Sequence, residues 1–230
     1  MPCATRAWPE VKEMTNATVT RLETVPTASI SDALDALGHP GSLHGIGPLA
    51  SGVRVSGRAF TVRYEPVTDE PGTVGDFLDD VEPGSVIIID NQGRTDCTVW
   101  GGIMTQIAAA RGIGGTVING TCRDTDTSLE QDYPIWSTAR FMRTGKDRVR
   151  LAEVQGEVVI DGVTIRPGDY ITADSDGVVA VAASIVDEVL DVAERIEQVE
   201  ADIVAAARDG STLREARQRV SYHTLQRKQA

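Results

Sequence analysis

The sequence of 230 residues has little aromatic content, only three cysteines and three histidines, and fewer basic than acidic side chains, giving a formal charge of −12. This charge opposes binding to nucleic acid or to an anionic membrane surface, so we expect neither as a partner. No apolar run reaches the roughly 18 residues that span a membrane. The first residues also lack the apolar segment of a secretory signal peptide, which predicts a cytoplasmic protein.

The few cysteines and histidines form no recognisable motif. Cys3, Cys97 and Cys122 have spacings that fit neither a disulfide framework nor a zinc site, so we interpret them as reduced thiols. Cys122 has no histidine near it in the sequence, which argues against a nucleophilic role. The histidines are scattered, and no two of them lie four residues apart on a helical pattern, which argues against a histidine metal site.

The chain is predicted to be one α/β domain with an appendage at each end. Residues 1–26 are polar and are interpreted as an N-terminal arm, and residues 184–230 as a C-terminal helical extension that begins with a long amphipathic helix. Residues 27–183 are assigned to the α/β domain, with a helix expected in residues 73–82. Residues 157–182 alternate between apolar and polar positions with Asp-Gly and Pro-Gly turns, which predicts an antiparallel β meander.

A βαβ unit is predicted at the centre of the domain. An apolar strand ends at Asp90, a helix opens with Gly101 and Gly102, and a second apolar strand is followed by Arg123 and Asp124. Two strands joined through one helix indicate parallel pairing, and such sheets bind ligands at the carboxyl ends of their strands. We therefore expect Arg123 and Asp124 to lie at a ligand-binding edge.

The glycine pair has two interpretations. Gly101, Gly102, Ile103 and Met104 open a helix, where bare backbone and free N–H groups favour a carboxylate or phosphate. The same glycines also suit a tight turn from strand to helix without any ligand. A lone glycine pair does not decide between an anion-binding site and a turn.

Arg123 and Asp124 supply opposite charges beside that helix start. A guanidinium grips a carboxylate with two hydrogen bonds, and a carboxylate in a loop is a natural ligand of Mg²⁺ or Mn²⁺. Together these groups describe a site for a small 2-keto acid, whose enolate a metal ion stabilises during retro-aldol cleavage or decarboxylation. The alternative is that the two residues only pair with other loop residues and brace the structure.

Three stretches carry a resemblance to a known family: "DNQGRTDCTVWGGIMTQIAAARGIGGTVINGTCRDTD", "GVTIRPGDYITADSDGVVAV" and a helix ending near "ARDG". Over roughly residues 25–215 the chain resembles the RraA-like family. That family holds divalent-metal 4-hydroxy-4-methyl-2-oxoglutarate aldolases, which also decarboxylate oxaloacetate, and catalytically different regulators of ribonuclease E. The resemblance implies a layered β/β/α fold with a central βαβ unit, an antiparallel β meander and a long C-terminal helix.

The resemblance also assigns roles to residues. It implies that Asp124 is the metal ligand, that Arg123 grips the substrate, and that the backbone of residues 101–104 holds a carboxylate. It further implies homotrimers or dimers of trimers with sites between subunits, in which a glutamate from a neighbour reaches metal-bound water. Glu200 matches that glutamate best and Glu197 is the alternative, although a solvated helix face explains Glu200 equally well.

One position departs from the family pattern. The aldolases carry an acid directly after the first glycine, where this chain has Gly102. Asp96 is a candidate catalytic replacement, although an acid on a surface loop is the simpler interpretation. The departure leaves two alternatives to the aldolase open: a relative recruited to a different carbon-carbon lyase, decarboxylase or hydratase reaction, or a non-catalytic regulator that binds a ribonuclease.

Overall fold

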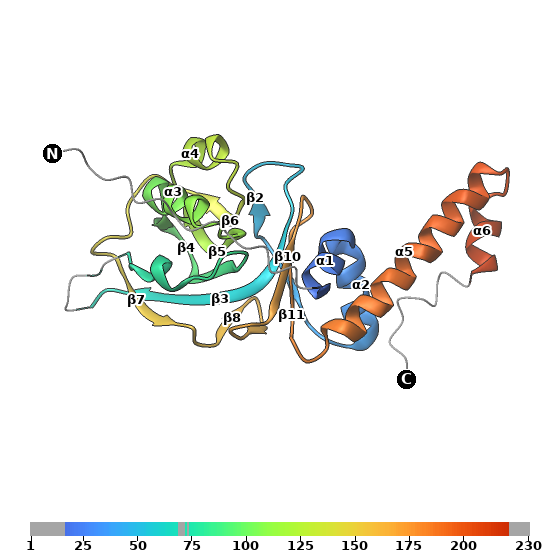
Figure 1. The fold of residues 1–230 in the computed structure, drawn as a ribbon, viewed down its shortest axis with the longest axis horizontal. Helices are drawn as coiled ribbons and strands as arrows, with labels where there is room; N and C mark the ends of the chain where they lie inside the picture. The colour runs from blue at the N-terminus through green and yellow to red at the C-terminus, as the bar shows by residue number, and fades with distance from the viewer. Residues whose placement is uncertain (1–16, 69–71, 73, 221–230) are drawn as a thin grey trace.

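The fold is known from a computed structural model, which describes residues 17–68, 72 and 74–220. Within this part of the chain, one mixed sheet contains β1 (Ser42–Leu43), β2 (Gly47–Pro48), β3 (Val55–Pro66), β4 (Val86–Trp100), β5 (Gly115–Cys122), β6 (Ile135–Arg140), β7 (Val149–Val154), β10 (Tyr170–Ala173) and β11 (Val178–Val181). The strands follow the spatial order β1, β11, β10, β3, β4, β5, β6 and β2, and β7 pairs with β3 outside that order. Helices lie on two sides of this sheet (Figure 1).

The two ends of the sheet are held near one another. β1 pairs with β11 at one end of the order and β2 pairs with β6 at the other, yet β1 ends at Leu43 and β2 begins at Gly47. So short a connection spans little distance, and the sheet must curve back on itself. One apolar cluster accordingly contains residues from strands at both ends of the order, including Leu43, Ile46, Val86, Ile88, Val117, Trp136, Ile171 and Val178.

The predicted parallel βαβ unit is confirmed. β4 pairs in parallel with β5 and α3 (Gly102–Ala110) connects them, while β3–β4 and β5–β6 are also parallel. A further short helix, α4 (Thr125–Glu130), follows β5 directly. Because the carboxyl ends of parallel strands share one edge of a sheet, the starts of α3 and α4 lie next to each other.

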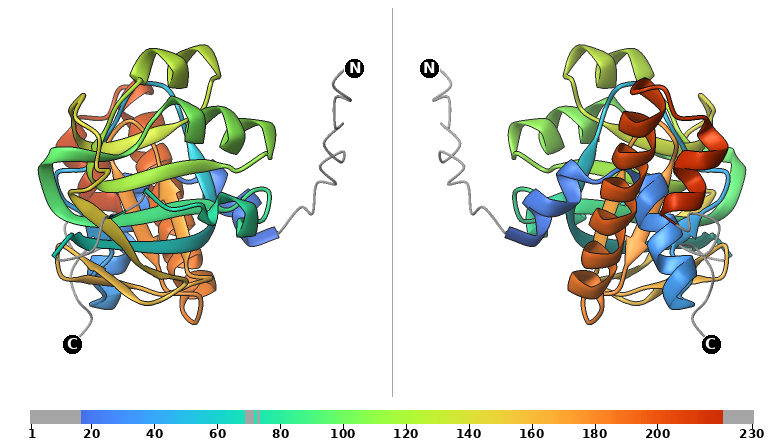
Figure 2. Two further views of the ribbon diagram at one scale, coloured as in Figure 1. Left: turned by 90° about the vertical axis from the view of Figure 1, so that its left-hand side faces the viewer. Right: turned by 90° about the vertical axis from the view of Figure 1, so that its right-hand side faces the viewer.

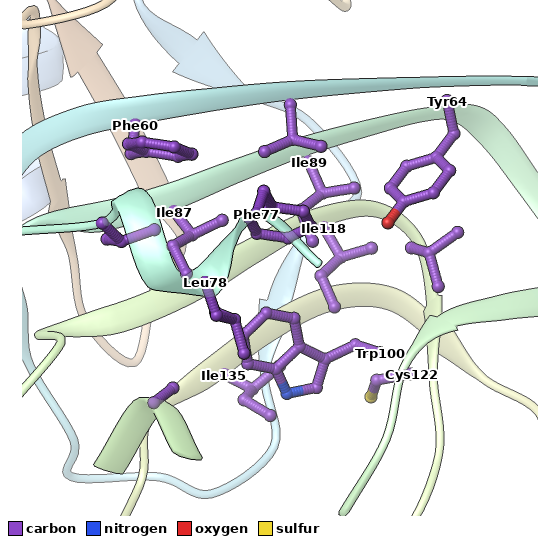
Figure 3. Packing of buried hydrophobic residues seen from close by; sticks show 14 of the residues in the cluster. Phe60, Tyr64, Phe77, Leu78, Ile87, Ile89, Trp100, Ile118, Cys122 and Ile135 are labelled. Atoms are coloured by element: carbon purple, nitrogen blue, oxygen red, sulfur yellow. The ribbon is translucent and has the colours of Figure 1, made fainter. Parts of the chain in front are cut away.

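A second apolar cluster lies between the sheet and the α3 side of the molecule. α3 and a 3₁₀ helix, η1 (Phe77–Asp80), contribute to it. Each large side chain buried there stabilises the fold by about 1.5–3 kcal/mol. Figure 3 shows the packing of Phe60, Tyr64, Phe77, Leu78, Ile87, Ile89, Trp100, Ile118, Cys122 and Ile135.

The remaining helices pack beside β10 and β11. They are α1 (Ala17–Thr24), α2 (Thr27–Leu37), α5 (Val186–Arg208) and α6 (Leu213–Arg219). The predicted long C-terminal helix is confirmed as α5, which contacts α2 and extends away from the sheet with α6 folded back against it (Figures 1 and 2). Among the described residues, no helix combines the length and apolar character needed to cross a membrane.

The antiparallel meander is also present, although it is divided between two sheets. β10 pairs with β11 in the main sheet, whereas β8 (Val158–Ile160) and β9 (Val163–Ile165) form a separate hairpin. The Asp161-Gly162 turn joins this hairpin, and both of its residues have positive φ angles. Such angles are typical of tight hairpin turns, which explains why the sequence signal was reliable there.

Two local expectations differ from the structure. Residues 1–16 lie outside the described residues, but the later part of the expected arm forms α1, in which Leu22 is fully buried. Leu22 and Val25 pack in a core cluster shared with α5, a long-range contact that the polar composition of the segment conceals. Residue 73 of the helix expected in residues 73–82 lies outside the described residues, and within residues 74–82 the structure has only the 3₁₀ turn η1, which Pro83 and Gly84 follow closely.

Candidate active site

The carboxyl ends of β4 and β5 bring the glycine pair and the Arg-Asp pair together. Trp100, the last residue of β4, lies opposite Cys122, the last residue of β5. The Arg123 N–H donates a hydrogen bond of 3.0 Å to the Trp100 carbonyl oxygen. The start of α3 and the residues after β5 are therefore direct neighbours.

Asp124 holds a conformation that its own helix does not require. It precedes α4 with φ 55° and ψ 42°, in the left-handed region that aspartate tolerates better than most residues. A carboxylate at this position normally caps the helix it precedes, and losing such a cap costs about 1 kcal/mol. Asp124 makes no cap for α4 and instead accepts the Gly102 N–H through Oδ2 at 2.8 Å. Its side chain is thereby fixed at the start of α3.

Gly101 is glycine because of this close approach. Its φ of −152° is extended backbone that any residue adopts, so a turn alone does not explain it. A Cβ atom at position 101 would lie 2.9 Å from Asp124 Oδ2 and 3.2 Å from Arg123 Nε. At position 102 a Cβ atom would lie 3.4 Å from Asp124 Oδ2, which is ordinary contact. The first glycine therefore makes room for the charged pair, whereas position 102 could hold a Cβ atom in ordinary contact with Asp124.

The predicted anion-binding backbone is partly occupied by the protein itself. The Gly102 N–H is bonded to Asp124. Ile103 and Met104 follow in the first turn of α3, where N–H groups have no partner within the helix. These two N–H groups and the positive end of the helix dipole are the features at the start of α3 that favour an anion.

Arg123 and Asp124 keep most of their polar atoms open. Arg123 Nε lies 3.6 Å from Asp124 Oδ2, and Arg123 Nη1 donates to the Met142 carbonyl oxygen over a long 3.4 Å. The two side chains are 39% and 48% exposed. Asp124 Oδ1 receives no hydrogen bond from any residue that the structure describes. The pair therefore leaves a guanidinium and one carboxylate oxygen accessible, in addition to its contacts within the loop.

Asp96 is held by an ion pair on the segment where β4 bulges. Arg94 donates to both of its carboxylate oxygens, from Nε at 2.9 Å and from Nη2 at 2.8 Å. This hydrogen bonding is the main cause that lowers the pKa of the Asp96 carboxyl from its ordinary value. Asp96 is therefore ionised at neutral pH and is a poor proton donor there, and its catalytic role remains a prediction.

Glu200 and Glu197 do not join Asp124 within one chain. Both lie on α5, on the other side of the sheet from α3 and α4 (Figure 1). Glu197 has a local partner, because Ser29 of α2 donates a hydrogen bond to it. A role for Glu200 therefore depends on a neighbouring subunit.

The donor set fits Mg²⁺ or Mn²⁺ better than zinc. No three His, Cys, Asp or Glu side chains gather within residues 17–68, 72 and 74–220 in a way that holds a metal. Zinc sites usually need three or four such ligands, whereas Mg²⁺ keeps several waters and uses one or two protein oxygens. Asp124 Oδ1 is such an oxygen.

Sequence reasoning missed the groups that α4 contributes. Thr127 Oγ1 lies 3.4 Å from the Cβ position at residue 102, so it borders the space that Gly102 leaves free. The six residues of α4 contain little apolar periodicity, and without recognising that helix nothing in the sequence places Thr127 beside Gly102.

A hollow in the described part of the chain lies away from these residues. It has a volume of about 590 Å³ and is lined by residues that include His44, Ser137, Arg140 and Asp176. Neither Arg123 nor Asp124 lines it. The charged groups of the candidate site are therefore separate from this hollow.

Comparison with known proteins gives the same family along most of the chain. A family model described as RraA-like, "Aldolase/RraA", matches residues 27–180. A protein of Halalkalibacterium halodurans named "Putative 4-hydroxy-4-methyl-2-oxoglutarate aldolase" is 33% identical over 179 residues, which cover 77% of this chain and 82% of the relative. The region that the family model matches includes the whole segment from Gly101 to Asp124.

Two further relatives are more similar in sequence. Protein DlpA of Legionella pneumophila is 41% identical over 200 residues, or 85% of this chain, but the chain spans only 32% of that protein's length. A crystal structure of an uncharacterized protein from Pseudomonas syringae pv. tomato is 47% identical with a TM-score of 0.82, covering 87% of this chain and 96% of that one. The fold is thus that of a known structure, while the names of these two proteins state no reaction.

The two glycines predict a contrast between otherwise similar variants. Gly101→Ala should displace the Asp124 carboxylate and break its bond to the Gly102 N–H, because the new methyl group needs the space of Oδ2. Unfolding free energy should fall by about 1.5–3 kcal/mol, as for a lost charged hydrogen bond. Gly102→Ala, the matched control, should keep the bond and be as stable as the wild type or more so, because alanine favours helix by up to about 1 kcal/mol.

The measurement is the ¹H,¹⁵N spectrum of the residue 102 amide together with chemical denaturation. The chemical shift of this amide should lose the signature of a hydrogen bond in Gly101→Ala and keep it in Gly102→Ala. An unchanged amide in Gly101→Ala would show that the close approach at residue 101 is not what demands glycine.

Proposed function

The chain belongs to the RraA-like family, and we propose that it is a divalent-metal-dependent lyase acting on a short, anionic 2-keto acid. The reaction is retro-aldol cleavage or decarboxylation, in which the bond next to the keto group breaks and an enolate forms. One observation carries the proposal: the Asp124 carboxylate is fixed on the Gly102 N–H at 2.8 Å, beside the open guanidinium of Arg123. This arrangement supports binding a carboxylate and a cation next to each other.

The substrate carboxylate is the part that this chain binds directly. Arg123 has donors left after its long bond to Met142, and its planar fork matches a carboxylate. The N–H groups of Ile103 and Met104 add donors at the positive end of the α3 dipole. In a protein with a formal charge of −12, these donors provide the local positive site that an anionic substrate needs.

Asp124 would hold Mg²⁺ or Mn²⁺ through Oδ1, with water and substrate oxygens completing the coordination. A cation bound there supplies Lewis-acid stabilisation of the negative charge that develops on the keto oxygen. Asp124 Oδ2 keeps the carboxylate oriented through the Gly102 N–H. Arg123 meanwhile holds the other end of the substrate.

For proton transfer, the chain offers fewer suitable side chains than it does for binding the substrate. Position 102 has no side chain, and Asp96 is ionised in its ion pair with Arg94. Water must therefore deliver the proton to the enolate unless a neighbouring subunit supplies an acid. We accordingly propose that cleavage of 4-hydroxy-4-methyl-2-oxoglutarate is slow in this protein.

Gly102 also favours a second candidate function. A larger substrate, or a different carbon-carbon lyase, decarboxylase or hydratase reaction, would use the space between Asp124 and Thr127 that an acid would fill. A non-catalytic regulator that binds a ribonuclease is less well supported. Such a protein has no evident need for an aspartate that gives up its local helix cap to hold an open carboxylate.

We also propose that the site is completed by a second copy of the chain. Ile103 is 81% exposed at the start of α3, and Met142, whose carbonyl oxygen contacts Arg123, is 75% exposed. Val204 and Leu213 are about half exposed on the hairpin of α5 and α6 that extends from the sheet. Exposed apolar groups at these two places support a homo-oligomer, a trimer or hexamer, in which α5 carries Glu200 to a neighbour's Asp124.

The proposed function is tested by a panel of 2-keto acids with Mg²⁺ and Mn²⁺, including oxaloacetate and 4-hydroxy-4-methyl-2-oxoglutarate. Pyruvate release, read through a coupled dehydrogenase, should appear with metal, vanish with excess EDTA and return when metal is restored. Borohydride with substrate should not inactivate the protein, because the mechanism forms no lysine adduct. Turnover that continues in EDTA would refute the metal-dependent reaction.

The variant Gly102→Asp separates the two candidate functions. If the protein is an aldolase lacking one acid, Gly102→Asp should raise aldol cleavage by about 10²-fold or more, the usual gain from general acid–base help. The control is Gly102→Asn, which has the same size without an ionisable proton and should give no increase. An unchanged aldol rate, with loss of whichever activity the panel finds best, would instead identify Gly102 as a mark of altered specificity.

Mixed oligomers test whether Glu200 serves a neighbour. Asp124→Ala and Glu200→Ala should each be inactive, and mixing their subunits should restore up to about a quarter of the wild-type activity, since one interface in four then joins two intact residues. As a control, Glu188→Ala on the same helix should be active by itself. Verified mixed oligomers without recovered activity would exclude a shared site.

A further inference from the structure

The two halves of the proposed site are the start of α3 and Asp124, which precedes α4. Three buried side chains connect these two helices. Trp100 Nε1 donates to Thr105 Oγ1 of α3 at 3.0 Å, and Thr105 Oγ1 lies 3.3 Å from Ser128 Oγ of α4. Trp100, Thr105 and Ser128 are 1%, 0% and 1% exposed. Figure 3 shows Trp100 within the apolar cluster that surrounds its ring.

We propose that Trp100, Thr105 and Ser128 are positioning residues that fix the start of α3 relative to Asp124. Gly102 lies three residues before Thr105 in α3, and Asp124 lies four residues before Ser128 at the start of α4. A shift between the two helices would therefore change the bond from the Gly102 N–H to Asp124 directly. As a statement about catalysis, the proposal rests on the proposed function.

Trp100 extends the same connection to Arg123. Its carbonyl oxygen accepts the Arg123 N–H at 3.0 Å and also the Thr98 hydroxyl at 2.9 Å. Its indole is stacked on Tyr133 with ring centroids 6.0 Å apart, and the Tyr133 N–H bonds the Ser128 carbonyl oxygen at 2.9 Å. Trp100 thus contacts, through backbone and side chain, the elements that carry both charged residues of the site.

Burial makes this chain of hydrogen bonds rigid. An indole ring has a single hydrogen-bond donor, its N–H group. Among the described residues, the Thr105 hydroxyl is the one acceptor that this N–H group contacts. Breaking such a bond leaves a buried polar group without a partner, which is costly in an apolar surrounding. The three groups therefore stay bonded, and they hold α3 and α4 in one arrangement.

A nearby pair of equal burial provides a control. Thr116 Oγ1 and Tyr133 Oη are 2.9 Å apart, in residues that are 0% and 5% exposed. This pair joins β5 to the segment after α4 and does not link α3 to α4. Thr105→Val and Thr116→Val therefore remove the same hydroxyl from the same kind of residue, and each takes the hydrogen-bond partner from one buried aromatic side chain. Thr105→Val in addition takes the partner from Ser128 Oγ.

The experiment compares Ser128→Ala, Thr105→Val and Thr116→Val in the full-length protein. The midpoint of thermal unfolding should fall in both valine variants, and at least as far in Thr105→Val, which also unpairs Ser128 Oγ. Exchange of the Gly102 amide hydrogen should be on the order of tenfold faster in Ser128→Ala and Thr105→Val and unchanged in Thr116→Val. The rate of the best reaction found should fall by about 10²-fold in the first two variants, mainly in kcat, and Thr105→Ser should restore it.

Gly102 exchange that is equal in all three variants would overturn the proposal. Ser128→Ala keeps the Trp100–Thr105 bond, so it provides a test even if Thr105→Val fails to fold. Amide exchange needs neither metal nor substrate. If exchange responds as expected while no lyase activity exists, the positioning role stands and only the proposed function fails.

Discussion

The structure of the site depends on one hydrogen bond, from the Gly102 N–H to Asp124 Oδ2 at 2.8 Å. It joins two helices that follow different strands, and it uses a carboxylate that would otherwise cap α4. A side chain at position 101 would displace this carboxylate, because the bond brings Oδ2 within 2.9 Å of where the side chain would begin. The bond also decides which oxygen of Asp124 stays free, and that oxygen is the atom available to a cation.

This bond is possible because the parallel strands β4 and β5 differ in length. The stretch from Asp90 to Trp100 in β4 pairs with the much shorter stretch from Asn119 to Cys122 in β5. The register shifts several times along this stretch of β4, which carries the ion pair of Arg94 and Asp96, and the strand ends level with β5 again. The start of α3 therefore arrives beside the residues after β5, and the buried contacts of Trp100 keep it there.

Sequence predicted those parts of the molecule that depend on local pattern. The βαβ unit, the meander turns and α5 follow from apolar periodicity and glycine positions, and the nearness of the helix start to Arg123 and Asp124 follows from parallel strands. Burial of Leu22, the helix α4 and the bonds among Trp100, Thr105 and Ser128 depend on contacts between distant segments, which single-residue preferences do not encode. The role proposed for Asp124 came both from its charge at the end of a strand and from family resemblance, whereas the role proposed for Glu200 came from the resemblance alone.

We propose that Asp124 is a metal ligand held in place by α3. The most direct test is titration with Mn²⁺ in the presence of oxalate, an unreactive analogue of a 2-keto acid. Asp124→Asn can still accept the Gly102 N–H but offers no anionic oxygen, whereas Asp126→Asn removes another exposed acid two residues away. We expect Mn²⁺ to bind at least about tenfold more weakly to Asp124→Asn than to the wild type, and equally well to Asp126→Asn. Equal Mn²⁺ affinity in Asp124→Asn and the wild type would contradict it.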